Sequence, residues 1–230
     1  MRRIFKWLVL SMVVVVGIAV AGWYFFLKTD PAPRAAIKET PTISPPAGSS
    51  GPSGTWSVQP GNAQNFVGYR VTEKLLADVA QTEATGRTDN VTGSMKVDGS
   101  TISDVTVTAD LRDLKSDQDF RDGRIKTSGL ESDRFPEAKF VLTSPITLTA
   151  VPAAGETVTA TATGDFTLHG VTRRVTISLQ GRWDGKEVQV VGHLPISFSD
   201  YGITAPTSTF VASVENHGEM ELQLFFTKRT

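Results

Sequence analysis

The sequence of 230 residues contains no cysteine. Disulfide bonds, thiolate metal sites, thiol nucleophiles and a lipidated N-terminal cysteine are therefore excluded together. Only three histidines occur, His169, His193 and His217, and no strand pattern places two of them two residues apart. A G-x-S-x-G elbow, a Gly-rich phosphate loop and other nucleophile–base signatures are also missing. We therefore expect no catalytic residue, no metal site and no cofactor.

An excess of positive charge is missing from most of the chain. Residues 1–54 carry six Lys/Arg and two Asp/Glu, a net charge of +4, whereas residues 55–230 carry the remaining 17 and 22, a net charge of −5. Nucleic-acid-binding domains need a basic patch or stripe to meet the phosphate backbone. The acidic larger part of the chain therefore excludes nucleic acid as a partner.

Charge is absent altogether from one long apolar run, Leu8–Leu27. About 20 residues at a rise of 1.5 Å span about 30 Å, the thickness of a bilayer core. The three basic residues before the run favour a cytoplasmic N-terminus. We predict that residues 1–27 form a signal-anchor transmembrane helix, single-pass, with the rest of the chain on the extracytoplasmic side. A cleaved signal peptide, with Ala19–Ala21 as its A-x-A site, is the alternative.

Aromatic residues are absent from the next segment, which holds six of the 12 prolines of the chain. With almost no large apolar side chain, this segment cannot build a core of its own. We predict that residues 28–53 form a semi-extended tether that reaches about 30–80 Å. The folded domain is then expected over residues 54–230.

Alternation of apolar and polar residues dominates that domain. In Thr157–Leu168 the residues Val158, Ala160, Ala162, Gly164, Phe166 and Leu168 share one face, and threonines occupy most of the other. This period of two predicts a half-buried strand, and about eight strands of this kind follow the short "TWSVQ". Because the polar face is outside, a membrane barrel is excluded.

Long strands in sequential hairpins favour an all-β, eight-stranded, antiparallel up-and-down barrel over a sandwich, since closure removes exposed edges. One or two short helices interrupt the strands. The first is "SDQDFRDGRIKTSG", with Ser116 as N-cap and Gly129 as the stop signal. The second is expected over Thr72–Gln81.

Two stretches go beyond this strand pattern and resemble the YceI-like family. The "LHGVT" of Leu168–Thr172 matches the L-x-H-G-V-T corner of that family. Arg121–Ile125 and Phe135–Phe140 match its R-D-x-x-L helix and the F-P-x-x-x-F that follows. The resemblance covers about residues 54–228, with a departure at Gln59–Ala63, where the family often has Asp-Pro-x-His-Ser. It implies an exported, lipocalin-like barrel that is associated with polyisoprenoid binding and is located in the cell envelope, in the periplasm.

Three polar residues in these motifs are open to a structural or a functional role. We interpret His169 as the corner of a hairpin, with its imidazole bonded to nearby backbone and Gly170 at a positive φ. Contact with a ligand head group is the alternative. Arg121 and Arg124 are the best candidates for holding a polar or phosphorylated ligand end near the barrel mouth, although such residues more often form a solvated helix face.

Three functions are compatible with such a barrel. In the first, a membrane-tethered barrel binds a long apolar ligand, an isoprenoid or another lipid, in its interior. In the second, the barrel is filled and acts as a scaffold for protein interactions; the small residues at Gly93, Ala160, Ala162 and Gly164 favour remaining room instead. In the third, an isomerase or cyclase works inside the barrel, but no acid–base pair is evident. The first predicts an apolar wall made by Met95, Val107, Ala160, Ala162, Phe166, Leu168, Ile177, Leu179, Val190, Leu194, Leu222, Leu224 and Phe226.

Overall fold

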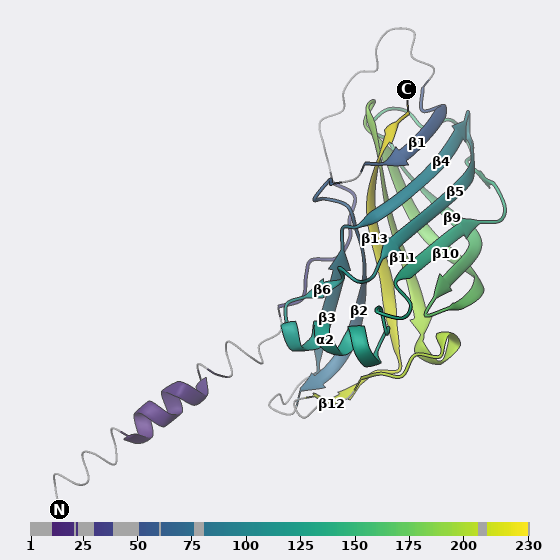
Figure 1. Cartoon of the computed structure of the whole chain (residues 1–230). Coiled ribbons are helices and arrows are strands. Elements are labelled where there is room, and N and C mark those ends of the chain that lie inside the picture. Colours follow the sequence, from purple (N-terminus) through teal and green to yellow (C-terminus); the bar gives the residue numbers. More distant parts are fainter. Residues whose placement is uncertain are drawn as a thin grey trace, which may run out of the picture.

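The computed structural model describes residues 11–20, 22, 30–38, 51–59, 61–75, 81–206 and 211–229. Its main body is a single antiparallel sheet rolled into a barrel (Figure 1). The strands are β1 (Gly54–Val58), β2 (Phe66–Leu75), β3 (Thr82–Thr88), β4 (Val91–Asp98), β5 (Thr101–Asp110), β6 (Lys115–Ser116), β7 (Glu137–Leu142), β8 (Ile146–Thr147), β9 (Thr157–Leu168), β10 (Val171–Trp183), β11 (Glu187–Ser197), β12 (Val211–Val214) and β13 (His217–Lys228).

Eight strands close the barrel in the order β1-β4-β5-β7-β9-β10-β11-β13, and β13 pairs back with β1. From β4 onward, successive members of this ring follow one another along the chain, as the prediction of an up-and-down barrel requires. β13 is long enough to pair with β1 near its C-terminal end and with β2 near its start. The strands β2, β3 and β6 therefore extend the wall beyond the ring at the lower end of the barrel in Figure 1.

The alternation of apolar and polar residues in the sequence corresponds to side chains that point alternately into and out of the barrel. In β9, Ala162, Phe166 and Leu168 are buried in the core, whereas Thr157, Thr159 and Thr161 are exposed. The same pattern along β13 buries Met220, Leu222, Leu224 and Phe226 inside. Side chains of a strand point to opposite faces in turn, so one apolar face per strand yields one continuous interior.

Two short helices accompany the strands. The helix α2 (Asp119–Ser128) ends at Gly129, the predicted stop, and it begins two residues after the expected start because its N-cap is Gln118. The second, the 3-10 helix η1 (Phe198–Tyr201), follows β11. The helix expected over Thr72–Gln81 is wrong at its start: Thr72–Leu75 belongs to β2, paired with β3 and β12. Residues 76–80 lie outside the described part.

The N-terminal apolar run is described only in part. Residues 11–20 and 22 are helical, and the side chains of residues 11–20 are exposed. Within the described residues, no helix reaches the length and apolarity that crossing a membrane requires. The rest of the predicted span, residues 1–10, 21 and 23–27, lies outside them.

Residues 30–38, called the strap here, lie along the outer wall of the barrel. They belong to the segment predicted as a tether, whose residues 39–50 lie outside the described part. The strap has no regular secondary structure. At one end the Asp30 N–H donates to Asp117, next to α2, and at the other the Lys38 carbonyl accepts a hydrogen bond from Arg182 near the opposite end of the barrel. The strap therefore spans the barrel wall lengthwise.

Candidate ligand-binding site

Among the described residues, two apolar cavities lie in the interior of the barrel, each with a volume of about 140 Å³. The lower compartment lies at the α2 end, and its wall includes Leu111, Ile125, Ile196 and Phe198. The upper compartment lies at the other end, beneath Trp183 and Phe226 among others. Both compartments are lined by Val67, Ala138, Phe166 and Met220. These four side chains therefore form the partition between two halves of one interior.

Most of the wall predicted from the sequence lies in these cavities. Phe166 lines both compartments, and Leu194 is buried in the core but lines neither. Leu168, Arg121 and Arg124 line the lower compartment. The upper compartment is lined by Met95, Val107, Ala160, Ala162, Ile177, Leu179, Val190, Leu222, Leu224 and Phe226.

Sequence reasoning missed the wall contributed by β2. Val67, Tyr69, Val71 and Glu73 alternate along this strand and line the lower compartment. The signal was present in "FVGYRVTEKL", where Val67, Tyr69 and Val71 recur at every second position. Assigning a helix from Thr72 onward concealed it.

The glycines on the inner face do not create the free space that the sequence suggested. A Cβ built on Gly164 would lie 2.5 Å from the Phe140 ring, and one on Gly93 would lie 3.2 Å from Val107 Cγ2. These contacts show that neighbouring side chains already use the room. The Tyr69 ring similarly packs over Gly86, with 2.4 Å between Cε1 and a Cβ built there. The free volume in the upper compartment therefore lies elsewhere, and the alanines Ala160 and Ala162 do line it.

A buried charged group stands where α2 meets the lower compartment. The Arg121 guanidinium pairs with Glu73 at 2.5 Å and also with Asp117, and the side chains of Arg121 and Glu73 are 8% and 5% exposed. Burial alone would lower the pKa of Arg121, but the charge of Glu73 and other neighbouring groups raises it. Two carboxylates thus surround one guanidinium, and the three groups together carry a net charge of −1. Arg121 has its charge neutralised and is not free to hold an anion.

Tyr69 supplies an unpaired polar atom beside this group. Its Oη is buried and has no hydrogen-bond partner among the described residues. Burial raises the pKa of Tyr69, an effect that the charge of Arg121 only partly opposes. The hydroxyl therefore stays neutral and keeps its proton available for donation. A buried donor without a partner carries a desolvation cost of about 1–3 kcal/mol.

His169 occupies the corner between β9 and β10. Its backbone has a φ of 51° and the following Gly170 has a φ of 74°. The ring Nδ1 lies 3.0 Å from the carbonyl oxygen of Tyr201, and the ring packs edge-on against Phe135 with centroids 4.4 Å apart. A bond to backbone and a positive φ at Gly170 are the features expected of a structural corner. His169 lines neither compartment.

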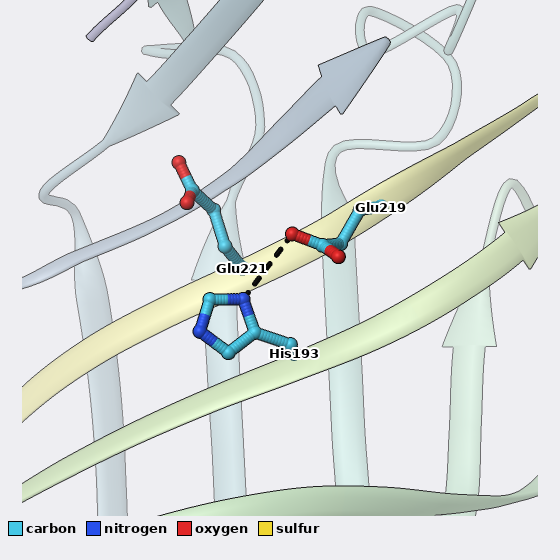
Figure 2. Close-up of side chains that lie close together, drawn as sticks. All are labelled: His193, Glu219 and Glu221. Carbon is cyan, nitrogen blue, oxygen red and sulfur yellow. Dashed lines mark hydrogen bonds and ion pairs between the residues drawn. The ribbon is translucent and has the colours of Figure 1, made fainter. Parts of the chain in front are cut away.

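His193, Glu219 and Glu221 form a cluster on the outer wall (Figure 2). One ligand atom from each lies within 4.8 Å of the others, and His193 Nδ1 lies 3.2 Å from Glu219 Oε1. This is the one group of metal-ligating side chains with such spacing among the described residues. Its donor set alone would suit a divalent cation.

Arginines already neutralise the carboxylates of that cluster. Arg87 lies 2.7 Å and Arg70 3.5 Å from Glu221 Oε1, and Arg34 of the strap lies 2.8 Å from Glu219 Oε1. Glu83 also pairs with Arg34 and Arg70, so three guanidinium groups face three carboxylates and leave no excess negative charge for a cation. We interpret the cluster as part of the outer surface of the barrel that binds the strap.

Comparison with known proteins identifies relatives of this chain. The sequence model of the YceI-like domain family matches residues 56–226. A UPF0312 protein of Pseudomonas putida (strain W619) is 35% identical over 114 residues, which are 46% of this chain and 56% of the relative. A UPF0312 protein of Vibrio parahaemolyticus is 28% identical over 143 residues, 58% of this chain and 72% of the relative. The match to the Pseudomonas relative thus spans little more than half of its length.

Solved structures share the barrel at low sequence identity. A polyisoprenoid-binding domain from Saccharophagus degradans has a TM-score of 0.56 at 17% identity, covering 76% of this chain and 98% of that domain. BcnA from Burkholderia cenocepacia has a TM-score of 0.53 at 18% identity, covering 73% and 98%. At such identities the likeness establishes the fold.

Proposed function

The chain belongs to the YceI-like family, and from this premise we propose that its barrel binds a long apolar ligand, an isoprenoid or another lipid. The pair of apolar compartments inside the barrel is the observation that carries the proposal. A cavity of about 150 Å³ lined by apolar side chains stays dry and accepts a molecule such as benzene. Each compartment is of that size, so a chain-like molecule that occupies both matches the interior better than a compact one.

Desolvation is the driving force of the proposed binding. About 300 Å² of apolar ligand surface removed from water contributes about 7.5 kcal/mol before ordering costs. A ligand that reaches from one compartment to the other must pass the partition, where Met220 and Phe166 stand. Methionine is unbranched and adapts its shape readily, which makes Met220 the side chain that we expect to move. No catalytic step is part of the proposal.

The polar end of the ligand, on this proposal, lies in the lower compartment and is uncharged. The ion group of Glu73, Asp117 and Arg121 carries a net negative charge, which disfavours a phosphate. The neutral Tyr69 hydroxyl beside it suits an oxygen that accepts a hydrogen bond, such as a carbonyl or a hydroxyl. Since Tyr69 Oη is buried, the ring must turn slightly to meet such an oxygen. A role for Arg124, which lines the same compartment from α2, remains a prediction.

Membrane attachment is the second part of the proposal. The uncharged run Leu8–Leu27 and the basic residues before it support a single-pass anchor with the barrel on the extracytoplasmic side of the cell membrane. Such an anchor would hold the barrel near a lipid source or receiver. Flotation of the full chain with vesicles, before and after an alkaline carbonate wash, tests the anchor: a protein that stays in the lipid fraction supports it, and one released by the wash contradicts it.

Native mass spectrometry followed by lipid extraction tests the ligand. A chain that begins at Asp30 retains the strap and both compartments, and circular dichroism checks that it is folded. We expect an apolar molecule to co-purify or, after delipidation, a fluorescent isoprenoid analogue to be taken up. A folded barrel that is consistently empty and takes up no analogue contradicts the proposal and favours a scaffold that binds other proteins.

A further inference from the structure

The strap is held on the barrel by contacts to its backbone as well as to its side chains. Along its first half, the Ala32 N–H donates to Thr85 Oγ1 at 2.9 Å, and Arg70 donates to the Ala32 carbonyl at 2.7 Å. Further along, Gln189 donates to the Ala36 carbonyl at 3.0 Å and accepts from the Lys38 N–H at 2.9 Å. Side chains of the barrel therefore form hydrogen bonds with the backbone in both halves of the strap.

The centre of the strap contacts a fully buried residue of the outer wall. Glu221 has an exposed fraction of 0% and accepts a hydrogen bond from the Ala35 N–H, while Ala35 itself is 7% exposed. Beside it, Arg34 bridges Glu83 at 2.9 Å and Glu219 at 2.8 Å. Burying a carboxylate is costly unless it is paired, and here the Ala35 N–H of the strap joins Arg70 and Arg87 in pairing Glu221. These contacts fix the strap in one position along the wall.

The strap begins at the α2 end of the barrel. Asp30 donates through its N–H to Asp117 at 2.6 Å, and Asp117 pairs with Arg121 in the wall of the lower compartment. Only Lys28 and Thr29 separate Asp30 from Leu27, the last residue of the apolar run. Three residue steps span at most about 10 Å. A membrane anchor that ends with this run would therefore begin within that distance of Asp30.

We propose that the strap orients the barrel, holding its α2 end, with the lower compartment, against the lipid surface. The inference rests on the membrane anchor of the proposed function. A free tether over residues 28–53 would let the barrel turn in any direction at a distance of about 30–80 Å. A docked strap shortens the connection to about 10 Å and leaves the upper end of the barrel facing away. A lipid then enters or leaves through the lower end, next to its membrane.

Fluorescence quenching in vesicles tests this orientation on the full chain. Because the protein has no cysteine, a single introduced cysteine takes a fluorophore at one position only. Gly123→Cys labels α2, where an added Cβ meets no atom within 4 Å. Lys186→Cys labels the exposed turn between β10 and β11 at the opposite end. Since β10 has 13 residues, the labels stand about 30 Å apart along the barrel axis.

Quencher-bearing lipids should remove most of the fluorescence of the Gly123→Cys label and little of that of the Lys186→Cys label. A flexible Gly/Ser insertion of about 40 residues, with a root-mean-square length of about 35 Å that exceeds the separation of the labels, is then placed between Thr29 and Asp30 and should abolish the difference. The same insertion between Lys38 and Gly51, on the other side of the strap, is the matched control and should preserve it. Equal quenching of the two labels in a vesicle-bound protein overturns the orientation. A protein that does not bind vesicles contradicts the anchor instead, so the two failures are distinguishable.

Discussion

Replacing Ala162 by phenylalanine tests whether the upper compartment has room for a ligand. Ala162 lies on β9 with an exposed fraction of 2%, is paired with Ile177 of β10, and lines this compartment. The substitution adds a ring the size of benzene to a cavity of about 140 Å³. A cavity of about 150 Å³ accepts benzene, so the ring has room by volume.

The two possible outcomes differ in sign. A ring that enters the cavity gains up to about 1.5–3 kcal/mol from burial, less its lost rotamer freedom, so the free energy of unfolding should stay level or rise. A ring forced into a packed wall costs about 1–3 kcal/mol, which lowers the melting temperature by about 2–4 °C for each kcal/mol in a domain of this size. In the first case the ring also displaces ligand, and the affinity should fall at least tenfold, by about 1.4 kcal/mol.

Thermal unfolding and uptake of a fluorescent isoprenoid analogue are measured side by side. Thr161→Phe is the matched control, because Thr161 precedes Ala162 on β9 and its side chain is exposed on the outer face. The control should leave uptake unchanged. If Ala162→Phe melts lower and binds the analogue as well as the original protein does, the upper compartment is neither spacious nor the binding space, and our reasoning fails.

Three further substitutions test single parts of the structure. Tyr69→Phe removes a buried hydroxyl without a partner and should raise the free energy of unfolding by about 1 kcal/mol, measured by urea denaturation; a destabilised variant would show that the hydroxyl has a partner. Glu221→Ala leaves Arg70 and Arg87 facing each other without their carboxylate and should cost about 3 kcal/mol, and unchanged stability would disprove the buried pairing. His169→Ala should cost about 1–3 kcal/mol through the lost corner hydrogen bond while affinity for the analogue is kept. A large loss of affinity at normal melting temperature would give His169 a role in binding.

The strand pattern was the most predictive part of the sequence. The alternation in Thr157–Leu168 coincides with β9 from its first to its last residue, because an apolar face and a polar face leave only one way to place the strand in a barrel wall. The helix predicted from Thr72 onward was wrong because tertiary contacts decide the structure there. The strand β2 there is held by pairing with β3 and β12, and such partners, distant in sequence, override local preference.

The pattern predicts which way a side chain points but not how much space is left. Gly164 and Ala162 look equally small in sequence, yet the Phe140 ring lies over Gly164 whereas Ala162 lines the open compartment. The difference depends on which strand lies beside which and on the reach of the neighbouring side chain. For the same reason the partition between the compartments, to which Phe166 and Met220 both contribute, was not foreseeable from either strand alone.

The docking of the strap on the barrel was not predictable from the sequence, because the two relevant sequence features each have a more common explanation. Charged residues at every second position of an outer strand usually meet water, and a Pro-rich segment is usually a linker. The prolines at 31 and 33 hold the residues before them in extended conformations, which presents the backbone N–H and carbonyl groups of the strap for side chains to reach. The groups that meet them come from β2, β3, β11 and β13, and Glu221 lies 186 residues from Ala35 along the chain. Water would solvate the Glu221 carboxylate in an uncovered wall, whereas here the strap covers it and the Ala35 N–H donates to it. The buried carboxylate of Glu221 and the side chain of Gln189 both bond to backbone groups of the strap, so the outer wall and the strap pack as one unit.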